Sequence, residues 1–294
     1  MNNQKIGYLL AFSAPFLYSV FNACFKIMSA ELNALSFLLV RGLTGMALVG
    51  LVALATGSRP ERRHWTVLIL AGLASAMSTA CITTAITIIP LYQAIVILYL
   101  YPAMSVILSW LINREKIGLL EIIGLAVAFA GCVLLVWPDE SAGLELKAAH
   151  FIAVLGSVFF ALCCVLIRRL GSDNNGLWPF FSFSLFCALS AFPLAWTFGV
   201  QIAYDRPKLL ALGASMAVIA SLAQVITYAA LKYLPAFKVG IIGSLEVLGG
   251  ALASVIIFHE PLPIKAVIGG GLILYAAFGF KRKVTVQDDE RDYV

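Results

Sequence analysis

Charged residues are scarce in this sequence. Only 12% of its 294 residues are Asp, Glu, Lys or Arg, whereas 62% are hydrophobic. Soluble globular domains carry about 25% charged residues, so this chain has too few polar side chains to cover a soluble surface. Its apolar residues form runs of roughly 20, the length at which an α-helix crosses a hydrocarbon core of about 30 Å. The composition therefore predicts an all-α membrane protein.

Metal-binding and catalytic motifs are also missing. The sequence contains no CxxC, HExxH, GxSxG or Walker A motif, and its three histidines are scattered. These absences argue against an enzyme, a metal site, a cofactor and direct use of ATP. The six cysteines lie inside hydrophobic runs, where they suit helix interfaces as small apolar residues: Cys24, Cys81, Cys132, Cys163, Cys164 and Cys187.

The distribution of basic residues predicts an orientation in the membrane. The net charge is +5, but the basic residues stand at the ends of hydrophobic runs, so nucleic acid is not an expected partner. Fourteen Lys and Arg residues fall on the side of the N-terminus, five fall on the opposite side, and Arg41 lies inside a run. Loops rich in Lys and Arg stay in the cytoplasm. We therefore expect a multi-pass protein of the inner (plasma) membrane with both termini cytoplasmic.

The sequence repeats itself with an offset of 145 residues. Three markers recur without a gap: Pro90 as Pro235, Glu115 as Glu260, and Gly124 as Gly269. Each copy contains five hydrophobic spans, and an odd number of crossings means that the second copy is inserted upside down. Inverted repeats are typical of secondary transporters, whose substrate site lies near the middle of the membrane between the halves. We assign residues 1–140 to the first five-helix repeat, 141–283 to the second, and 284–294 to a cytoplasmic tail.

Ten transmembrane helices are predicted. Two prolines, Pro90 and Pro235, mark tight reversals between the third and fourth and between the eighth and ninth spans, because a proline disfavours helical geometry in the residue before it. The spans are placed at about 6–27, 34–56, 66–88, 91–112, 119–137, 149–169, 178–199, 209–231, 237–258 and 264–281.

With these markers the chain resembles the drug/metabolite transporter superfamily, and specifically its EamA-type members with ten spans. In that family the fourth span of each repeat runs through a proline to a terminal glutamate. The first copy has Pro102 and Glu115, and the second has Glu246 and Glu260, with Val247 in the place of the usual proline. The resemblance implies a secondary transporter, usually an exporter, with a central cavity lined by spans 1, 3, 4, 6, 8 and 9. Because Val247 replaces that proline, the sequence contains no proline that would kink the middle of the ninth helix, and whether it is kinked stays open.

Glu246 is the foremost candidate for substrate binding. It lies about nine residues into its span, about 14 Å deep, where an ionised carboxylate costs roughly 2.5–3.5 kcal/mol. Such a residue faces a wet cavity, pairs with a cation or stays protonated. The nearby Gly243, Gly249 and Gly250 leave the carboxylate uncrowded, or alternatively serve close helix packing. Its counterpart in the first repeat is Tyr101.

Polar residues four positions apart form stripes on three other helices. Amides and phenols suit the orientation of a polar solute in an apolar pocket, although hydrogen bonds between helices explain the stripes equally well. The stripes consist of Tyr18, Asn22 and Lys26 in the first span, Gln93 and Tyr101 in the fourth, and Gln224 and Tyr228 in the eighth.

Arg41 is the one basic residue placed inside a span. It could hold a carboxylate substrate or pair with a buried acid, and it could equally extend to the outer interface. Lys26, Lys232 and Lys238 lie near span ends, where extension to the interface is expected.

These features predict a secondary active transporter of small organic metabolites, and an exporter of amino acids or related solutes in particular. The expected partners are the solute and membrane lipid, and the proton is one candidate for a coupling ion that the sequence does not identify. Two alternatives stay open: an importer or exchanger of a larger metabolite such as a cofactor, nucleoside or vitamin, and a membrane component that transports nothing. The sequence indicates neither the substrate, nor the direction, nor an oligomeric state.

Overall fold

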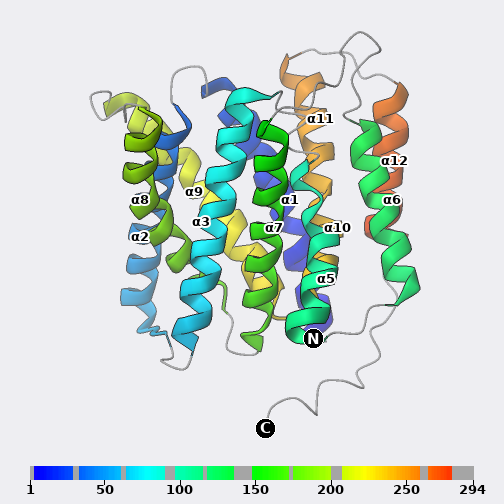
Figure 1. Ribbon diagram of the computed structural model, residues 1–294, viewed down its shortest axis with the longest axis horizontal. Helices are drawn as coiled ribbons and strands as arrows, with labels where there is room; N and C mark the ends of the chain where they lie inside the picture. The colour runs from blue at the N-terminus through cyan, green and yellow to red at the C-terminus, as the bar shows by residue number, and fades with distance from the viewer. Residues whose placement is uncertain are drawn as a thin grey trace.

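The chain folds into a bundle of helices (Figure 1). The computed structural model describes residues 3–28, 33–60, 64–89, 97–114, 118–135, 148–171, 175–199, 207–258 and 264–279, and these contain helices and no strand. The helices are α1 (Asn3–Met28), α2 (Ala34–Thr56), α3 (Trp65–Ile88), α5 (Tyr101–Asn113), α6 (Leu119–Leu135), α7 (Ala148–Arg168), α8 (Leu177–Phe198), α9 (Pro207–Ala230), α10 (Ala236–Gly243), α11 (Leu245–Phe258) and α12 (Ile264–Gly279).

These helices confirm the predicted spans. α10 and α11 are two halves of the ninth span, and the fourth span is described from residue 97 onward, with α5 as its helical part. Five of the described helices are long and apolar enough to cross a membrane, and three shorter helices are also apolar. The protein is therefore an all-α, multi-pass membrane protein.

Local signals set the ends of α2. Asn33 precedes the helix, and its Oδ1 accepts a hydrogen bond from the backbone N–H of Ser36 at 2.8 Å. This bond satisfies one of the free N–H groups of the first turn. Gly57 ends the helix with a φ of 66°, a conformation that glycine adopts without steric cost.

The packing of the helices has an approximate two-fold symmetry. The offset of 145 residues relates α1 to α7, α2 to α8, α3 to α9, α5 to α11 and α6 to α12. The contacts obey the same relation when each helix is replaced by its counterpart. The α3–α7 contact corresponds to the α9–α1 contact, and the α5–α7 contact corresponds to the α11–α1 contact. The α2–α8 and α6–α12 pairs map onto themselves and lie at opposite ends of the bundle in Figure 1. This pattern confirms the predicted pair of five-helix repeats.

Small residues let the paired helices approach closely. In α2, a Cβ added to Gly42 would lie 2.6 Å from the backbone nitrogen of Ala188 in α8. The α6–α12 pair is equally close, because a Cβ on Gly131 would lie 2.8 Å from the carbonyl oxygen of Gly269. Packing through small residues is the usual way in which helices associate in lipid.

Large apolar side chains cover the outside of the bundle. Trp196 is 90% exposed and Leu54 is 85% exposed. On a soluble protein a broad apolar surface of this kind would drive association, whereas in a membrane it faces the lipid tails. Buried polar residues are consequently confined to the helix interfaces inside the bundle.

Candidate functional site

Two helices are interrupted at equivalent positions. The ninth span breaks at Ser244, between α10 and α11, and in the first repeat a turn at Tyr99 and Leu100 precedes α5. Tyr99 and Ser244 are counterparts in the two repeats. Pro102 accounts for the first break, because it stands in the opening turn of α5, where proline is tolerated.

The ninth span is interrupted although Val247 stands in the place of the usual proline. Val247 cannot force a break, but the interruption lies three residues earlier. Ser244 donates its hydroxyl to the carbonyl oxygen of Ile241 at 2.6 Å, and its backbone N–H bonds to the carbonyl of Gly240 at 3.1 Å. Serine and glycine therefore take the role that proline has in the first repeat.

Tyr99 connects the two breaks. Its hydroxyl lies 3.0 Å from the carbonyl oxygen of Gly243 and 3.0 Å from Oε2 of Glu246, and it shares its one hydrogen between these two acceptors. The side chain of Tyr101 lies beside the same break, since a Cβ added to Gly243 would be 2.9 Å from its hydroxyl. Ser19 of α1 donates to the backbone oxygen of Glu246 at 3.4 Å. Glu246 thus lies where α1, α11 and the first-repeat break meet.

Gln224 of α9 is the centre of a second polar group. Its Oε1 accepts hydrogen bonds from the hydroxyl of Tyr18 at 2.6 Å and from Nη2 of Arg41 at 3.1 Å. Gln224 is 5% exposed and Arg41 is 8% exposed. Two helices of the first repeat and one of the second therefore share one buried amide.

Arg41 does not extend to the outer interface. Its guanidinium carbon lies 5.8 Å from the ring centre of Phe21 and 5.1 Å from that of Phe183. Faces of aromatic rings attract cations at these distances. The rings of α1 and α8 thus hold the charge of Arg41 inside the bundle, next to Gln224.

Helix α1 reaches both polar groups. Tyr18 bonds to Gln224, and the next residue, Ser19, lies 3.4 Å from the backbone oxygen of Glu246. The structure therefore brings together five groups from both repeats: Tyr18, Arg41, Tyr99, Gln224 and Glu246.

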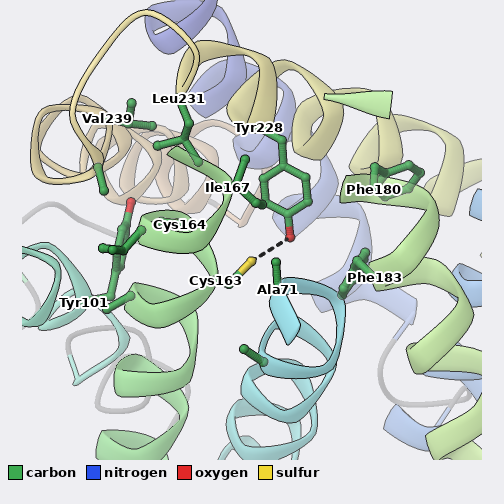
Figure 2. Close-up of a cluster of buried hydrophobic side chains, with 14 of the residues drawn as sticks. Ala71, Tyr101, Cys163, Cys164, Ile167, Phe180, Phe183, Tyr228, Leu231 and Val239 are labelled. Atoms are coloured by element: carbon green, nitrogen blue, oxygen red, sulfur yellow. Dashed lines mark hydrogen bonds between the residues drawn. The ribbon is translucent and has the colours of Figure 1, made fainter. Parts of the chain in front are cut away.

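Tyr228 lies outside this group of polar residues. Its hydroxyl lies 2.7 Å from Oγ of Ser75 in α3 and accepts a hydrogen bond from Sγ of Cys163 in α7 at 3.5 Å. Figure 2 shows this hydroxyl pointing toward Cys163 in a core that also contains Phe180 and Phe183 of α8. Tyr228 lies one turn beyond Gln224 on α9, yet its hydroxyl faces α3 and α7.

Three predicted residues cannot be placed. Gln93 lies outside the described residues, and α1 is described without the side chains of Asn22 and Lys26. Lys238 corrects an expectation, because it is buried in α10 beside the ring of Phe237 rather than extended to the interface. Sequence reasoning missed Tyr99, although its position opposite Ser244 in the repeat was a usable signal.

A crevice beside the first-repeat break lies between α5, α6 and α10, and it is lined by Tyr99, Pro102, Cys132, Gly240 and Ser244 among others. Within the described part of the chain, no three His, Cys, Asp or Glu residues gather closely enough to hold a metal ion.

Comparisons with known proteins agree with this architecture. The model of the EamA-like transporter family matches residues 5–137 and again residues 147–281. The pseudopaline exporter CntI of Pseudomonas aeruginosa, from strains UCBPP-PA14 and PAO1, is 29% identical over 280 residues, which are 95% of this chain and 96% of the relative. An uncharacterized membrane protein of Saccharomyces cerevisiae is 24% identical over 151 residues, 46% of this chain and 36% of that protein.

A solved structure shares the fold. It is titled "Crystal structure of protein" and superposes with a TM-score of 0.77 at 18% identity, covering 92% of this chain and 94% of the other.

Proposed function

This chain belongs to the EamA-like transporter family, and from that premise we propose that it exports small polar organic metabolites, amino acids or related solutes, across the inner membrane. Membership makes it a transporter and not an enzyme. The export direction is supported by the relative that is named an exporter and that matches over almost its whole length.

One observation carries the proposal: buried and half-buried polar side chains from both repeats meet at their interface. Arg41 and Tyr18 come from the first repeat and reach Gln224 of the second, while Tyr99 of the first reaches Glu246 of the second. A few convergent polar groups in apolar surroundings are what orients a small solute. Their position between repeats suits a site exposed alternately to the two sides of the membrane.

The bonds of Tyr99 suggest how access alternates. They join the break in one repeat to the break in the other. Movement of the two breaks away from each other would separate these partners and open the site to one side. We place the repeats at 1–140 and 141–283, in line with the two family matches, and both termini in the cytoplasm, in line with the basic loops.

The direct test is transport by the purified full chain in proteoliposomes. Vesicles receive a metabolite extract of the host cell, and mass spectrometry identifies the solutes that they accumulate beyond empty vesicles. Cells that lack or overproduce the protein are compared in parallel. We expect one class of small solute to accumulate in vesicles and to be depleted inside overproducing cells. Enrichment inside the overproducing cells would instead indicate import, and no accumulation in vesicles would contradict the proposal.

A further inference from the structure

Within the part of the chain that the structure describes, two buried hydrogen-bond donors at the site have no partner. They are Nε of Arg41 and Nε2 of Gln224. The orientation of the Gln224 amide is fixed by its neighbours: Arg41 has only donors, so the amide oxygen must face it. The amide nitrogen therefore remains, with its hydrogens, as a free donor beside the guanidinium.

The charge of Arg41 is also unbalanced within the described residues. Its guanidinium bonds to a neutral amide and faces two aromatic rings, and no described carboxylate reaches it. A buried cation of this kind and a buried unpaired donor are both costly. What the pair lacks is an acceptor, and preferably one with a negative charge.

We propose that Arg41 and Gln224 form the subsite that binds a carboxylate of the transported solute. The inference rests on the proposed function and names the substrate class. A carboxylate has two oxygens and can accept one hydrogen bond from each free donor, and charge-assisted bonds of this type are the strong ones. A solute that also carries an amino group suits Glu246, because α1 contacts Gln224 through Tyr18 and the backbone oxygen of Glu246 through the adjacent Ser19.

The neutrality of Gln224 is essential to this role. A glutamate at this position would pair with Arg41 permanently and compete with the solute. The amide instead holds the guanidinium by its oxygen at 3.1 Å and adds a donor of its own. Gln224 is thus a residue that determines specificity for an acidic group.

The scaffold itself does not need these two residues. Phe186 and Thr79 occupy the equivalent positions of the other repeat, and Thr79 bonds to the carbonyl oxygen of Ser75 in its own helix at 3.0 Å. The symmetric fold therefore forms with apolar or locally bonded side chains at these positions. The site formed by Arg41 and Gln224 has no equivalent at Phe186 and Thr79, the positions related to it by the repeat symmetry. The carboxylate therefore has one place to bind, and the solute binds in a single orientation.

The experiment uses the full chain in proteoliposomes supplied with the host-cell metabolite extract. We expect the solutes accumulated by the wild type to carry a carboxylate. Arg41→Gln and Gln224→Glu should each reduce their transport by about tenfold or more, the effect of losing one charge-assisted bond. Arg41→Lys should retain part of it. Thr79→Val, the counterpart of a change at Gln224, is the control and should transport like the wild type.

A competition experiment tests whether the carboxylate of the solute is the group that is recognised. Once a transported solute is identified, an excess of the acid should compete with it, and the carboxamide of the same solute should not. Transport of solutes without a carboxylate, equal competition by the carboxamide, or wild-type rates for folded Arg41→Gln and Gln224→Glu would overturn the subsite while leaving the transporter function in place. A wild type that moves no solute would instead overturn the proposed function.

Discussion

Glu246 combines a charge, a helix break and a contact between repeats. An ionised carboxylate at this depth costs roughly 2.5–3.5 kcal/mol, and a bound proton or a solute ammonium would remove that cost. The hydroxyl of Tyr99 donates to it at 3.0 Å, so one oxygen is held in place. A carboxylate held in this way could exchange a proton for a solute in each transport cycle.

Glu246→Gln should abolish coupling to protons. The amide keeps the shape and can still accept the bond from Tyr99, but it cannot take up a proton. The transport rate under an imposed pH gradient should fall to the rate without one, while the variant stays folded. Transport is measured in proteoliposomes with and without the gradient. If the variant kept the rate and pH dependence of the wild type, Glu246 would be a packing residue only.

Tyr228→Phe should affect stability rather than transport. The change removes a hydroxyl that bonds to Ser75 and Cys163, and such bonds between membrane helices are worth about 0.6 kcal/mol on average and up to about 1.7. Thermal unfolding in detergent should show a loss of that size, with Ser75→Ala in a double-mutant cycle as the control. Loss of transport at unchanged stability would assign Tyr228 to substrate binding.

The sequence located some of these residues but not their partners. The depth of Glu246 and the stripes containing Tyr18 and Gln224 follow from helical spacing. Tyr18 and Gln224 are 206 positions apart, however, and only the folded chain shows that they bond. The sequence left Arg41 undecided for the same reason, since rings on two distant helices hold it.

At the scale of the helices, a crowded glycine lies at the break in the ninth span. A Cβ at Gly243 would lie 2.9 Å from the hydroxyl of Tyr101, closer than side chains tolerate without movement. The spans themselves were predictable, because runs of apolar residues determine them. The break was not, because it comes from Ser244 and glycines rather than from a proline.

Gly243→Ala should destabilise the protein by about 1–3 kcal/mol through overpacking and slow transport. Tyr101→Phe removes the hydroxyl and should recover much of the loss in the double variant. Gly50→Ala is the control, because a Cβ there meets nothing within 4 Å. Thermal unfolding and transport rates provide the readout, and equal losses with and without Tyr101→Phe would rule out this contact as the cause.

At the scale of the molecule, the two repeats are interleaved rather than set side by side as separate bodies. The closest helix pairs, α3–α7, α6–α12, α2–α8 and α1–α9, each join one repeat to the other. The offset in the sequence predicted the relation between the repeats, but it could not predict that each helix packs mainly on the opposite one. That arrangement depends on contacts between the two repeats, which cannot be inferred from either repeat alone.

The interleaving has a consequence for biogenesis. When the ribosome has inserted the first five spans, most of the surfaces that will bury them do not yet exist. Residues 1–140 expressed alone should therefore be degraded, and co-expression with 141–294 should restore both fragments and transport, as measured by immunoblotting and vesicle assays. A stable first fragment would show that the early half can mature by itself. If the first fragment is degraded, the cell must protect the partly synthesised protein from membrane proteases until the last helix has been inserted.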